Sequence, residues 1–322
     1  MPRRVLAPRR VQNTCTGPDR LARLLAMARY RTLLTFAVAI LVAACASATP
    51  TVAPTDGPSI SPPSTTTPTA APPTADLEHP VGIVAIGHSA LTGEGTAGPI
   101  EPNLEASWAT GTLESVNSLY LRMIESLPAT EGHVSNQAAG GASASTLVGQ
   151  AKAALAKVPA PALVVIDTID NDIRCNASNV EQVTKWIADA LAYIHQASPN
   201  SQILVVDQPG RPSVDFVKSV VAKSPGTKTS IFTWSDPCSF YDAKGNLDEN
   251  AFAMLTAAID RYEDAQFQAC KLVPNCHDDG GVRRAYVDTI ENFSPDIAHF
   301  NVRGQAAQAE LLWPVVKGIL GL

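Results

Sequence analysis

Short apolar runs alternate with longer amphipathic segments over the C-terminal part of the chain. The strands expected at residues 162–166 and 202–206 hold uninterrupted aliphatic runs, with no alternation of polar side chains. Such runs are typical of central strands that are buried on both faces of a parallel sheet. Weaker or shorter strands are expected at residues 81–86, 134–138, 231–234 and 284–287.

The segments between these strands have the periodicity of helices. Residues 113–127, for example, carry apolar side chains at helical spacing, and the helix at 180–197 is preceded by the capping residues Ser178 and Asn179. Further helices are expected at residues 144–158, 213–222, 247–270 and 303–319. Strands that alternate with helices predict an α/β domain with a parallel sheet covered on both faces, and ligands of such sheets bind at the carboxyl ends of the strands.

Charge separates the beginning of the chain from the rest. Residues 1–45 contain eight Arg, no Lys and one Asp, a net charge of +7, whereas the whole chain carries −6, which leaves −13 for residues 46–322. An acidic body argues against nucleic acid as a partner, because phosphate binding needs Lys and Arg to replace counterions. The pattern predicts a basic leader followed by an exported acidic domain.

The leader ends in an apolar run over residues 33–44, preceded by Arg29 and Arg31. Its 12 residues suit a signal peptide, since a membrane-spanning helix needs about 20. Small residues directly before Cys45 resemble a bacterial lipobox, in which Cys45 is acylated and anchors the exported protein to the outer face of the cell membrane. A plain signal peptide with secretion and a short membrane anchor are the alternatives, and Met27 is an alternative start.

A linker separates the leader from the folded domain. Residues 49–75 contain eight Pro among Thr, Ser and Ala. Such a stretch cannot bury enough apolar surface to offset its ordering entropy. We therefore expect a disordered tether over residues 46–79 and a single domain over residues 80–322.

Four cysteines lie in the expected domain, and an even count in an exported chain predicts two disulfides. Cys270 and Cys276 are near enough in sequence to close a small loop, which leaves Cys175 to pair with Cys238. The other connectivities and a zinc site are alternatives, although the chain has no CxxC pair in this region.

Polar blocks follow the expected strands. The first strand leads into Gly87-His88-Ser89, the second into residues 136–143 and the third into residues 167–172, while Asp296-Ile-Ala-His299 precedes the closing helix. Because carboxyl ends of parallel strands meet at one edge of a sheet, these blocks are expected to converge.

The converging residue types suit nucleophilic catalysis. A serine hydroxyl needs a base to take its proton; His299 would serve Ser89, and Asp296, three residues earlier, would fix the tautomer of the imidazole. The oxyanion of a tetrahedral intermediate needs hydrogen-bond donors, which the Ser89 and Gly141 amides and the Asn171 side chain would supply. Asp167, Asp170 and Asp172 could also suggest calcium, but the full EF-type loop is missing.

The order of these blocks resembles the SGNH hydrolase superfamily, the GDSL-type esterases and lipases. The resemblance spans residues 81–320 and is most specific over residues 296–305. It implies a three-layer α/β/α sandwich with a mainly parallel, flavodoxin-like sheet, and ester hydrolysis that uses no metal or cofactor. It assigns Ser89 as nucleophile, Gly141 and Asn171 as oxyanion donors, His299 as the base and Asp296 as the residue that orients it.

Two residues depart from the family pattern. His88 stands where the family usually has Asp, and Ile169 stands where it usually has Gly. Trp108, in the long loop after Ser89, is expected either to pack in the core or to bind substrate.

These observations predict a serine esterase or lipase that acts on a small-molecule, lipid or glycan ester through an acyl-enzyme on Ser89. A polysaccharide O-acyl esterase or acyltransferase would use the same residues. A binding module that has kept the fold but lost activity is the third possibility, which His88 and Ile169 favour.

Overall fold

The computed structural model describes residues 77–322, except residues 99, 224–238 and 243. The expected leader, Cys45 and nearly all of the expected linker lie outside the described residues. So do Cys238 and the strand expected at residues 231–234. The predictions that concern these positions therefore stay predictions.

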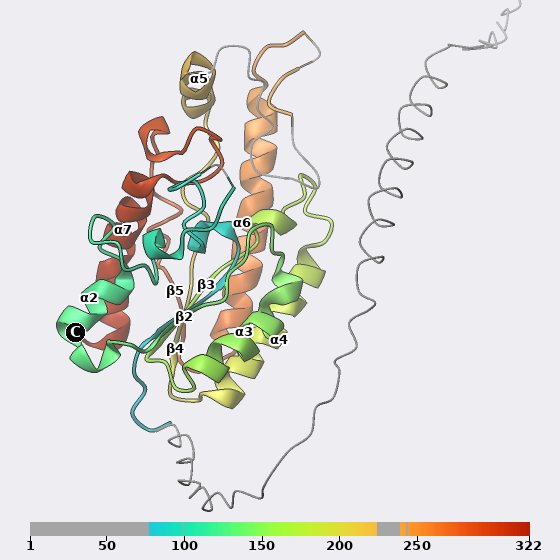
Figure 1. The fold of residues 1–322 in the computed structure, drawn as a ribbon. Coiled ribbons are helices and arrows are strands. Elements are labelled where there is room, and N and C mark those ends of the chain that lie inside the picture. Colours follow the sequence, from blue (N-terminus) through green and yellow to red (C-terminus); the bar gives the residue numbers. More distant parts are fainter. Residues whose placement is uncertain (1–76, 99, 224–238, 243) are drawn as a thin grey trace, which may run out of the picture. The chain divides into compact units, whose positions relative to one another are not determined.

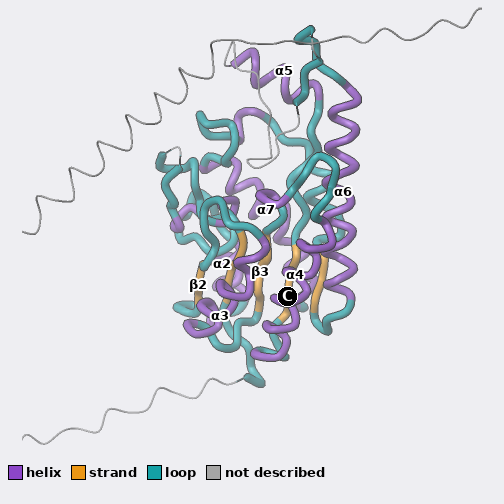
Figure 2. Tube along the Cα trace, turned by 90° about the vertical axis from the view of Figure 1, so that its right-hand side faces the viewer, coloured by secondary structure: helices purple, strands orange, loops and turns teal. Residues whose placement is uncertain are grey.

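The core of the domain is a five-stranded sheet in which every strand pair is parallel. Its strand order is β2-β1-β3-β4-β5, which is the flavodoxin-like order. Figure 2 shows the strands side by side between the helices. The α/β class and the parallel sheet predicted from the alternating pattern are confirmed. The strands are β1 (Ile83–Gly87), β2 (Val134–Asn136), β3 (Leu163–Asp167), β4 (Gln202–Val205) and β5 (Cys276–Asp278).

Helices cover both faces of the sheet, as Figure 1 shows, which gives the expected three-layer sandwich. The helices α3, α4 and α6 pack against one face, and α2 and α7 pack against the other. The α-helices are α2 (Leu119–Ser126), α3 (Leu147–Lys157), α4 (Val180–Ala197), α5 (Val214–Lys223), α6 (Glu249–Lys271) and α7 (Val302–Leu320). Short 3₁₀ helices lie in the connections: η1 (Ser89–Leu91), η2 (Leu104–Ala106), η3 (Pro128–Thr130), η4 (Ala144–Thr146), η5 (Asp170–Asp172) and η6 (Ile290–Asn292).

The two buried faces explain why the central strands have no polar alternation. In β1, Val84 and Ile86 belong to the core shared with α3, α4 and α6, whereas Ile83 and Ala85 belong to the core shared with α2 and α7. Successive side chains of a strand point to opposite faces, so both sets of positions must be apolar. All five residues of β1 and all five of β3 are buried.

One predicted strand is wrong, and one predicted helix is shorter than expected. Residues 284–287 form no strand, and the edge strand is instead β5, which has the polar sequence Cys-His-Asp. This strand is only partly buried, and His277 forms a side-chain hydrogen bond with Gln202 of β4, so no aliphatic run marks it. The helix expected at 113–127 begins only at Leu119, because the Ser118 hydroxyl accepts the Leu121 amide and caps the helix there.

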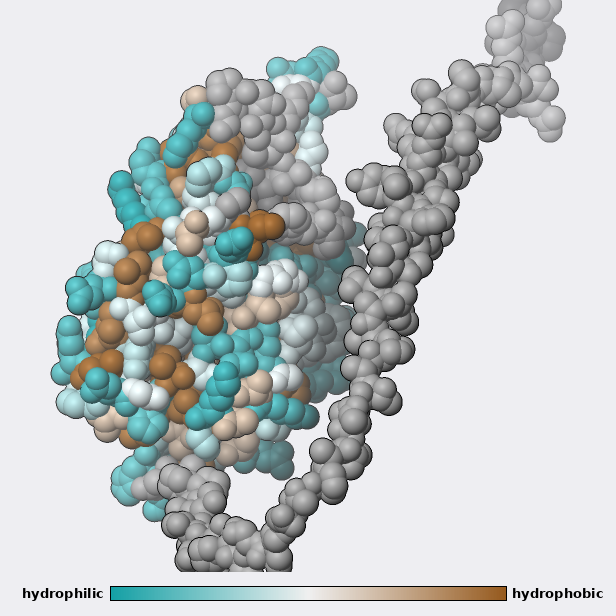
Figure 3. All heavy atoms as spheres, in the orientation of Figure 1, coloured by the Kyte–Doolittle hydropathy of each residue, from teal (hydrophilic) through white to brown (hydrophobic). Residues whose placement is uncertain are grey.

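Cys270 and Cys276 form the predicted disulfide, which links the end of α6 to β5. Within residues 77–322, apart from the gaps stated above, none of the helices is both long and apolar enough to cross a bilayer. On the face shown in Figure 3, hydrophobic residues are interspersed with hydrophilic ones.

Candidate active site

A cavity of about 600 Å³ brings together the residues that sequence analysis placed at strand ends. Its lining includes Ser89, Asp296 and His299, which lie far apart in the chain. Ser89 follows β1 and the other two precede α7, so the cavity lies at the carboxyl end of the sheet. This is the edge at which ligands of open parallel sheets bind.

The first strand delivers Ser89 to this edge through a turn that requires glycine. Gly87 is the last residue of β1, pairs with Asp167 of β3 and has a φ of 141°. A Cβ at this position would lie 1.8 Å from the Asp167 carbonyl oxygen, so no other residue fits. Ser89 then opens η1, and its carbonyl accepts hydrogen bonds from the amide and the hydroxyl of Thr92, at 3.0 and 2.8 Å.

His88 has a structural role beside the nucleophile. Its Nδ1 accepts the Ala90 amide at 3.3 Å, which caps η1 as a short acidic side chain would. Its Nε2 lies 3.3 Å from Oδ1 of Asp167 at the end of β3. Burial lowers the pKa of His88, but the Asp167 carboxylate outweighs it, and the pKa is raised overall. His88 therefore caps η1 while it faces a buried acid on the neighbouring strand.

Arg283 completes this buried charge network. Its Nη1 lies 2.9 Å from Oδ2 of Asp167, and both side chains are fully buried. Burial raises the pKa of Asp167, yet Arg283 and His88 lower it overall, so the carboxylate is ionised. The guanidinium carbon of Arg283 also lies 5.4 Å from the ring centroid of Trp108.

Trp108 is wholly buried and packs in the core shared with α2 and α7. It does not line the cavity, so the prediction that it binds substrate is wrong. The physical reason is that the loop after Ser89 turns inward here. The Trp108 amide donates to Gln305 of α7 at 3.0 Å, and its carbonyl accepts the Leu119 amide at 2.9 Å.

Asp296 and His299 form one compact turn before α7. Oδ2 of Asp296 lies 2.8 Å from Nδ1 of His299, and Oδ1 accepts the amides of Ala298 and His299 at 2.9 and 3.0 Å. The Ser294 hydroxyl also donates to Oδ1. Burial raises the pKa of Asp296, but these hydrogen bonds lower it overall. An ionised carboxylate thus holds the imidazole with Nε2 directed away from it.

The Nε2 atom of His299 contacts an unpredicted residue. Oε2 of Glu94 lies 3.3 Å from Nε2, and the Glu94 side chain is 7% exposed. In the described part of the chain, neither His299 nor any other side chain forms a hydrogen bond with the Ser89 hydroxyl. Ser89 and His299 thus share a cavity without being bonded in this conformation, which is common before substrate binds.

Two of the expected oxyanion donors lie close to one another. The Asn171 amide donates to the carbonyl of Ala142 at 3.0 Å, which holds η5 against the loop that contains Gly141. The backbone N–H groups of Ser89 and Gly141 donate no hydrogen bond to any described residue. Gly141 and Asn171 do not line the cavity. The structure thus brings these two residues together outside the cavity that Ser89 lines.

Ile169 has a backbone conformation that normally belongs to glycine. Its φ is 71° and its ψ is −31°, and its side chain is 1% exposed in the sheet's core. A β-branched residue with positive φ is a genuine outlier, at a cost on the order of 1–3 kcal/mol. Glycine is the residue that ordinarily adopts this conformation, so the chain holds a strained side chain at this position.

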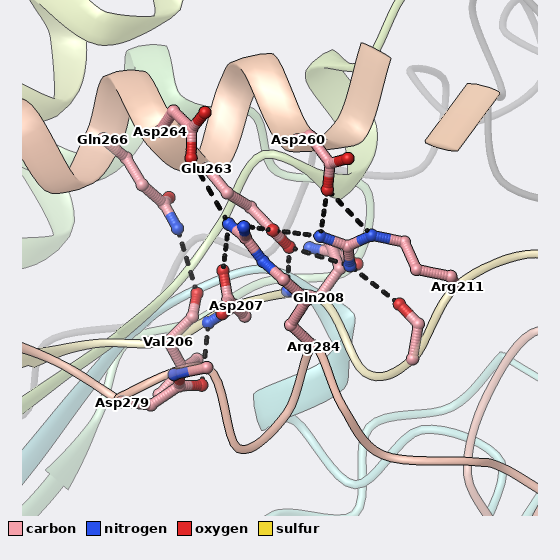
Figure 4. Close-up of polar contacts among 12 residues, drawn as sticks. Val206, Asp207, Gln208, Arg211, Asp260, Glu263, Asp264, Gln266, Asp279 and Arg284 are labelled. Atoms are coloured by element: carbon pink, nitrogen blue, oxygen red, sulfur yellow. Dashed lines mark hydrogen bonds and ion pairs between the residues drawn. The ribbon is translucent and has the colours of Figure 1, made fainter. Parts of the chain in front are cut away.

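A second polar network borders the cavity, and Figure 4 shows its contacts. Arg211 and Arg284 line the cavity, and both form ion pairs with Glu263 of α6. Arg211 also pairs with Asp260 at 2.7 Å, and Arg284 approaches Asp207 at 3.5 Å. In the described ranges, no group of three or more His, Cys, Asp or Glu residues is arranged to hold a metal ion.

Asp207 is the most perturbed acid of this second network. The residue lies just past β4 and is fully buried, and its amide donates to Asp279 at 3.0 Å. Burial and the neighbouring Glu263 and Asp279 carboxylates raise the pKa of Asp207 to about 9. Asp207 is therefore protonated at neutral pH.

Asp170 is another perturbed acid, and it lines the cavity itself. It opens η5, directly after the strained residue Ile169. Burial is the largest cause of its raised pKa, and the nearby Asp167 carboxylate adds to the rise. The cavity edge near η5 is therefore less negative than its run of acidic residues suggests.

Sequence reasoning missed the residues whose roles depend on the fold. Glu94 carries a weak signal, since it stands between two glycines directly after the nucleophile block. Arg211, Arg284 and Ser294 have no local pattern that marks them, because their contacts form only in the folded chain.

No protein-family model and no curated protein sequence matches this chain. Several solved structures are similar to it. The extracellular lipase of Streptomyces rimosus is 16% identical, with 74% of this chain and 99% of that chain covered and a TM-score of 0.46. Phospholipase A1 of Streptomyces albidoflavus is 12% identical over 74% and 99%, with a TM-score of 0.44. A carbohydrate esterase of family 2 from Corynascus thermopiles is 15% identical over 80% and 69%, with a TM-score of 0.47.

Proposed function

We propose that this protein is a serine hydrolase of the SGNH type that cleaves carboxylic esters. The observation that carries the proposal is the Asp296–His299 pair, joined at 2.8 Å, in the same cavity as Ser89 at the carboxyl end of a parallel sheet. An ionised acid, an oriented imidazole and a serine beside a substrate-sized cavity are the parts that acyl transfer requires.

The reaction proceeds in two half-reactions. His299 Nε2 takes the proton of Ser89 Oγ as Oγ attacks the ester carbonyl, and Asp296 faces the positive charge that the imidazole acquires. The bond between the carbonyl carbon and the alcohol oxygen then breaks, and His299 returns the proton to the departing alcohol. Water attacks the acyl-enzyme by the same route and releases the acid and free Ser89.

The backbone N–H of Ser89, which lines the cavity, is the first proposed oxyanion donor. The Gly141 N–H and the Asn171 side chain, which do not line the cavity in this conformation, are proposed to join it when substrate binds. The two backbone N–H groups have no acceptor among the described residues, so they are available to a developing negative charge. The Asn171 amide keeps the Gly141 loop in place through its bond to Ala142.

The cavity favours an ester with an apolar acyl part. Beyond Ser89 and His299, its wall includes hydrophobic side chains from the end of η5, α5, α6 and the segment before α7. These are Ile173, Phe216, Ile259, Phe293 and Ile297. Burial of an acyl chain against this wall would stabilise the bound ester by about 0.8 kcal/mol per methylene group.

The test is a comparison of wild type with Ser89→Ala on short p-nitrophenyl esters and with a fluorophosphonate probe. We expect hydrolysis and labelling in wild type and loss of both in the variant. Ser178→Ala, which changes an exposed serine before α4, is the matched control. Hydrolysis that persists in Ser89→Ala would refute the proposal.

A second candidate is a binding module without activity. The contact between His299 Nε2 and Glu94 at 3.3 Å, with no bond to Ser89 among the described residues, favours this alternative. Wild-type protein that is folded but not labelled at Ser89 by the fluorophosphonate would support it.

From the leader sequence we further propose that the protein is anchored outside the cell. A lipid on Cys45 would hold the domain at the outer face of the membrane on its Pro-rich linker. Metabolic labelling with a fatty-acid analogue, lost in Cys45→Ala, tests this.

A further inference from the structure

Glu94 is the one acid that contacts the proposed general base from the substrate side among the described residues. Its Oε2 lies 3.3 Å from His299 Nε2, the nitrogen that must exchange a proton with Ser89 and with the departing alcohol. Asp296, by contrast, contacts the other ring nitrogen, Nδ1. Glu94 lines the cavity together with Ser89 and His299.

The Glu94 carboxylate is held in place. The Thr92 hydroxyl lies 3.1 Å from Oε1 and is itself bonded to the Ser89 carbonyl, so the acid is tied to the nucleophile's own loop. The same oxygen lies against Gly140, where an added Cβ would be only 2.4 Å from Oε1. A buried acid that contacts both the nucleophile loop and Gly140 is part of the site rather than a solvated surface charge.

The chemistry of ester cleavage places the alcohol beside Glu94. To receive its proton, the departing oxygen must lie about 3 Å from His299 Nε2. Since Glu94 lies 3.3 Å from the same nitrogen, the carboxylate and the alcohol oxygen are within about 6 Å of one another. The apolar wall lined by Phe216 and Phe293 then remains for the acyl chain.

We infer that Glu94 is a specificity residue that faces the alcohol part of the ester and selects neutral, hydroxyl-bearing or cationic alcohols over alcohols with an anionic group. This inference rests on the proposed ester hydrolysis at Ser89. A carboxylate accepts hydrogen bonds from hydroxyl groups and attracts an ammonium group, whereas it repels a phosphate or a second carboxylate.

The two arginines at the cavity do not cancel this selectivity. Arg211 is paired with Asp260 and Glu263, and Arg284 with Glu263 and Asp264. Both positive charges are therefore already neutralised by acids of α6. An anionic alcohol would meet Glu94 without either of these cations to compensate for it.

Three butyrate esters that differ in the charge of the alcohol test the inference: monobutyrin, its phosphorylated counterpart and butyrylcholine. For wild type we expect kcat/KM to be about 10-fold or more higher for monobutyrin than for the phosphorylated ester, with butyrylcholine on the favoured side. In Glu94→Gln the ratio between the neutral and phosphorylated esters should fall to within about threefold. Glu101→Gln, which removes the same charge from an exposed position of the same loop, should keep the wild-type ratio.

The possible results separate this inference from the proposed function. Ser89-dependent hydrolysis with an unchanged ratio in Glu94→Gln would overturn the role of Glu94 and leave the esterase proposal intact. If wild type cleaves the phosphorylated ester and monobutyrin with equal kcat/KM, the proposed role of Glu94 is overturned, even if the variant does not fold. If fluorophosphonate fails to label Ser89 and no ester is cleaved, the proposed function fails and this inference fails with it.

Discussion

Asp167 and Arg283 form a fully buried ion pair beside the nucleophile turn, with 2.9 Å between Oδ2 and Nη1. The Asp167 carbonyl also accepts the His88 amide at 3.1 Å, so the pair lies against the backbone that presents Ser89. Breaking a buried pair leaves a charge without compensation, which is far more costly than losing a surface pair. The pair therefore links the stability of the domain to the geometry of its candidate site.

Arg283→Met is expected to destabilise the domain by about 3–5 kcal/mol, because Asp167 would remain buried with only His88 as partner. Urea unfolding of variant and wild type measures the change. Lys185→Met breaks an exposed pair with Asp189 and serves as control, with an expected effect of about 0.5 kcal/mol or less. A loss below about 1 kcal/mol in Arg283→Met would show that the pair is not important for stability.

This network also gives His88 a defined role beside the nucleophile. Nδ1 of His88 caps η1 while Nε2 faces Asp167. The sequence alone could not show this, because Asp167 lies far along the chain and only the parallel pairing of β1 with β3 brings the two residues together.

Much of the fold could be predicted because buried strands and helices have characteristic apolar patterns within their own sequence segments. Residues 163–166 are aliphatic since helices cover both faces of the sheet, and α4 has the bounds that its periodicity predicts. β5 could not be found in this way, because its hydrogen bonds to β4 need no apolar side chains.

The candidate site was predictable only in part, for a related reason. Ser89, Asp296 and His299 stand at the ends of elements, where sequence order indicates position. The contact of Glu94 with His299 forms only in the folded chain, and Trp108 turns into the core, and one sequence contains no geometry for either.

At position 169 we expect the glycine variant to be more stable than the alanine variant, which is the reverse of the usual order. The φ of 71° at Ile169 suits glycine, so Ile169→Gly relieves the strain while Ile169→Ala keeps it, and both lose the same buried packing. We expect both variants to be less stable than wild type, with the alanine variant about 1 kcal/mol below the glycine variant.

Ile173 provides the matched control in this comparison, measured by urea unfolding. It is equally buried but has a φ of −56°, so Ile173→Gly should be less stable than Ile173→Ala by about 0.5–1 kcal/mol. The same order at both positions would contradict the strain at Ile169.

Asp207 makes stability depend on pH. Its pKa is about 9 in the folded protein and near its ordinary value of 3.8 in the unfolded chain. Between these values the folded state holds a proton that the unfolded state has lost, so stability falls as pH rises, by at most about 1.4 kcal/mol per pH unit. Asp207→Asn should therefore gain stability relative to wild type as pH rises.

Urea unfolding of Asp207→Asn and wild type at several pH values between about 5 and 9 measures this difference. The raised pKa of His88 acts in the same direction, since its favourable charge is lost as pH rises through the folded value. Because His88 is present in both proteins, its contribution cancels in the comparison. A difference that does not change with pH would refute the raised pKa of Asp207.

Asp296 and Ser294 should affect catalysis to different extents. Asp296 contacts the imidazole directly, at 2.8 Å, so Asp296→Asn would favour the wrong tautomer and lower kcat by about a hundredfold to ten-thousandfold. Ser294 acts on the imidazole only through Asp296, so Ser294→Ala removes one hydrogen bond to that acid and should lower kcat by about two- to tenfold.

Turnover of a p-nitrophenyl ester measures both effects, and thermal unfolding shows that the variants remain folded. Asp189→Asn, an exposed change on α4, should leave kcat unchanged. Equal losses in Ser294→Ala and Asp296→Asn would mean that the whole turn before α7 collapses, rather than that the imidazole loses its tautomer. A variant Asp296→Asn with wild-type kcat would remove Asp296 from the proposed mechanism and leave Ser89 and His299 to act as a pair.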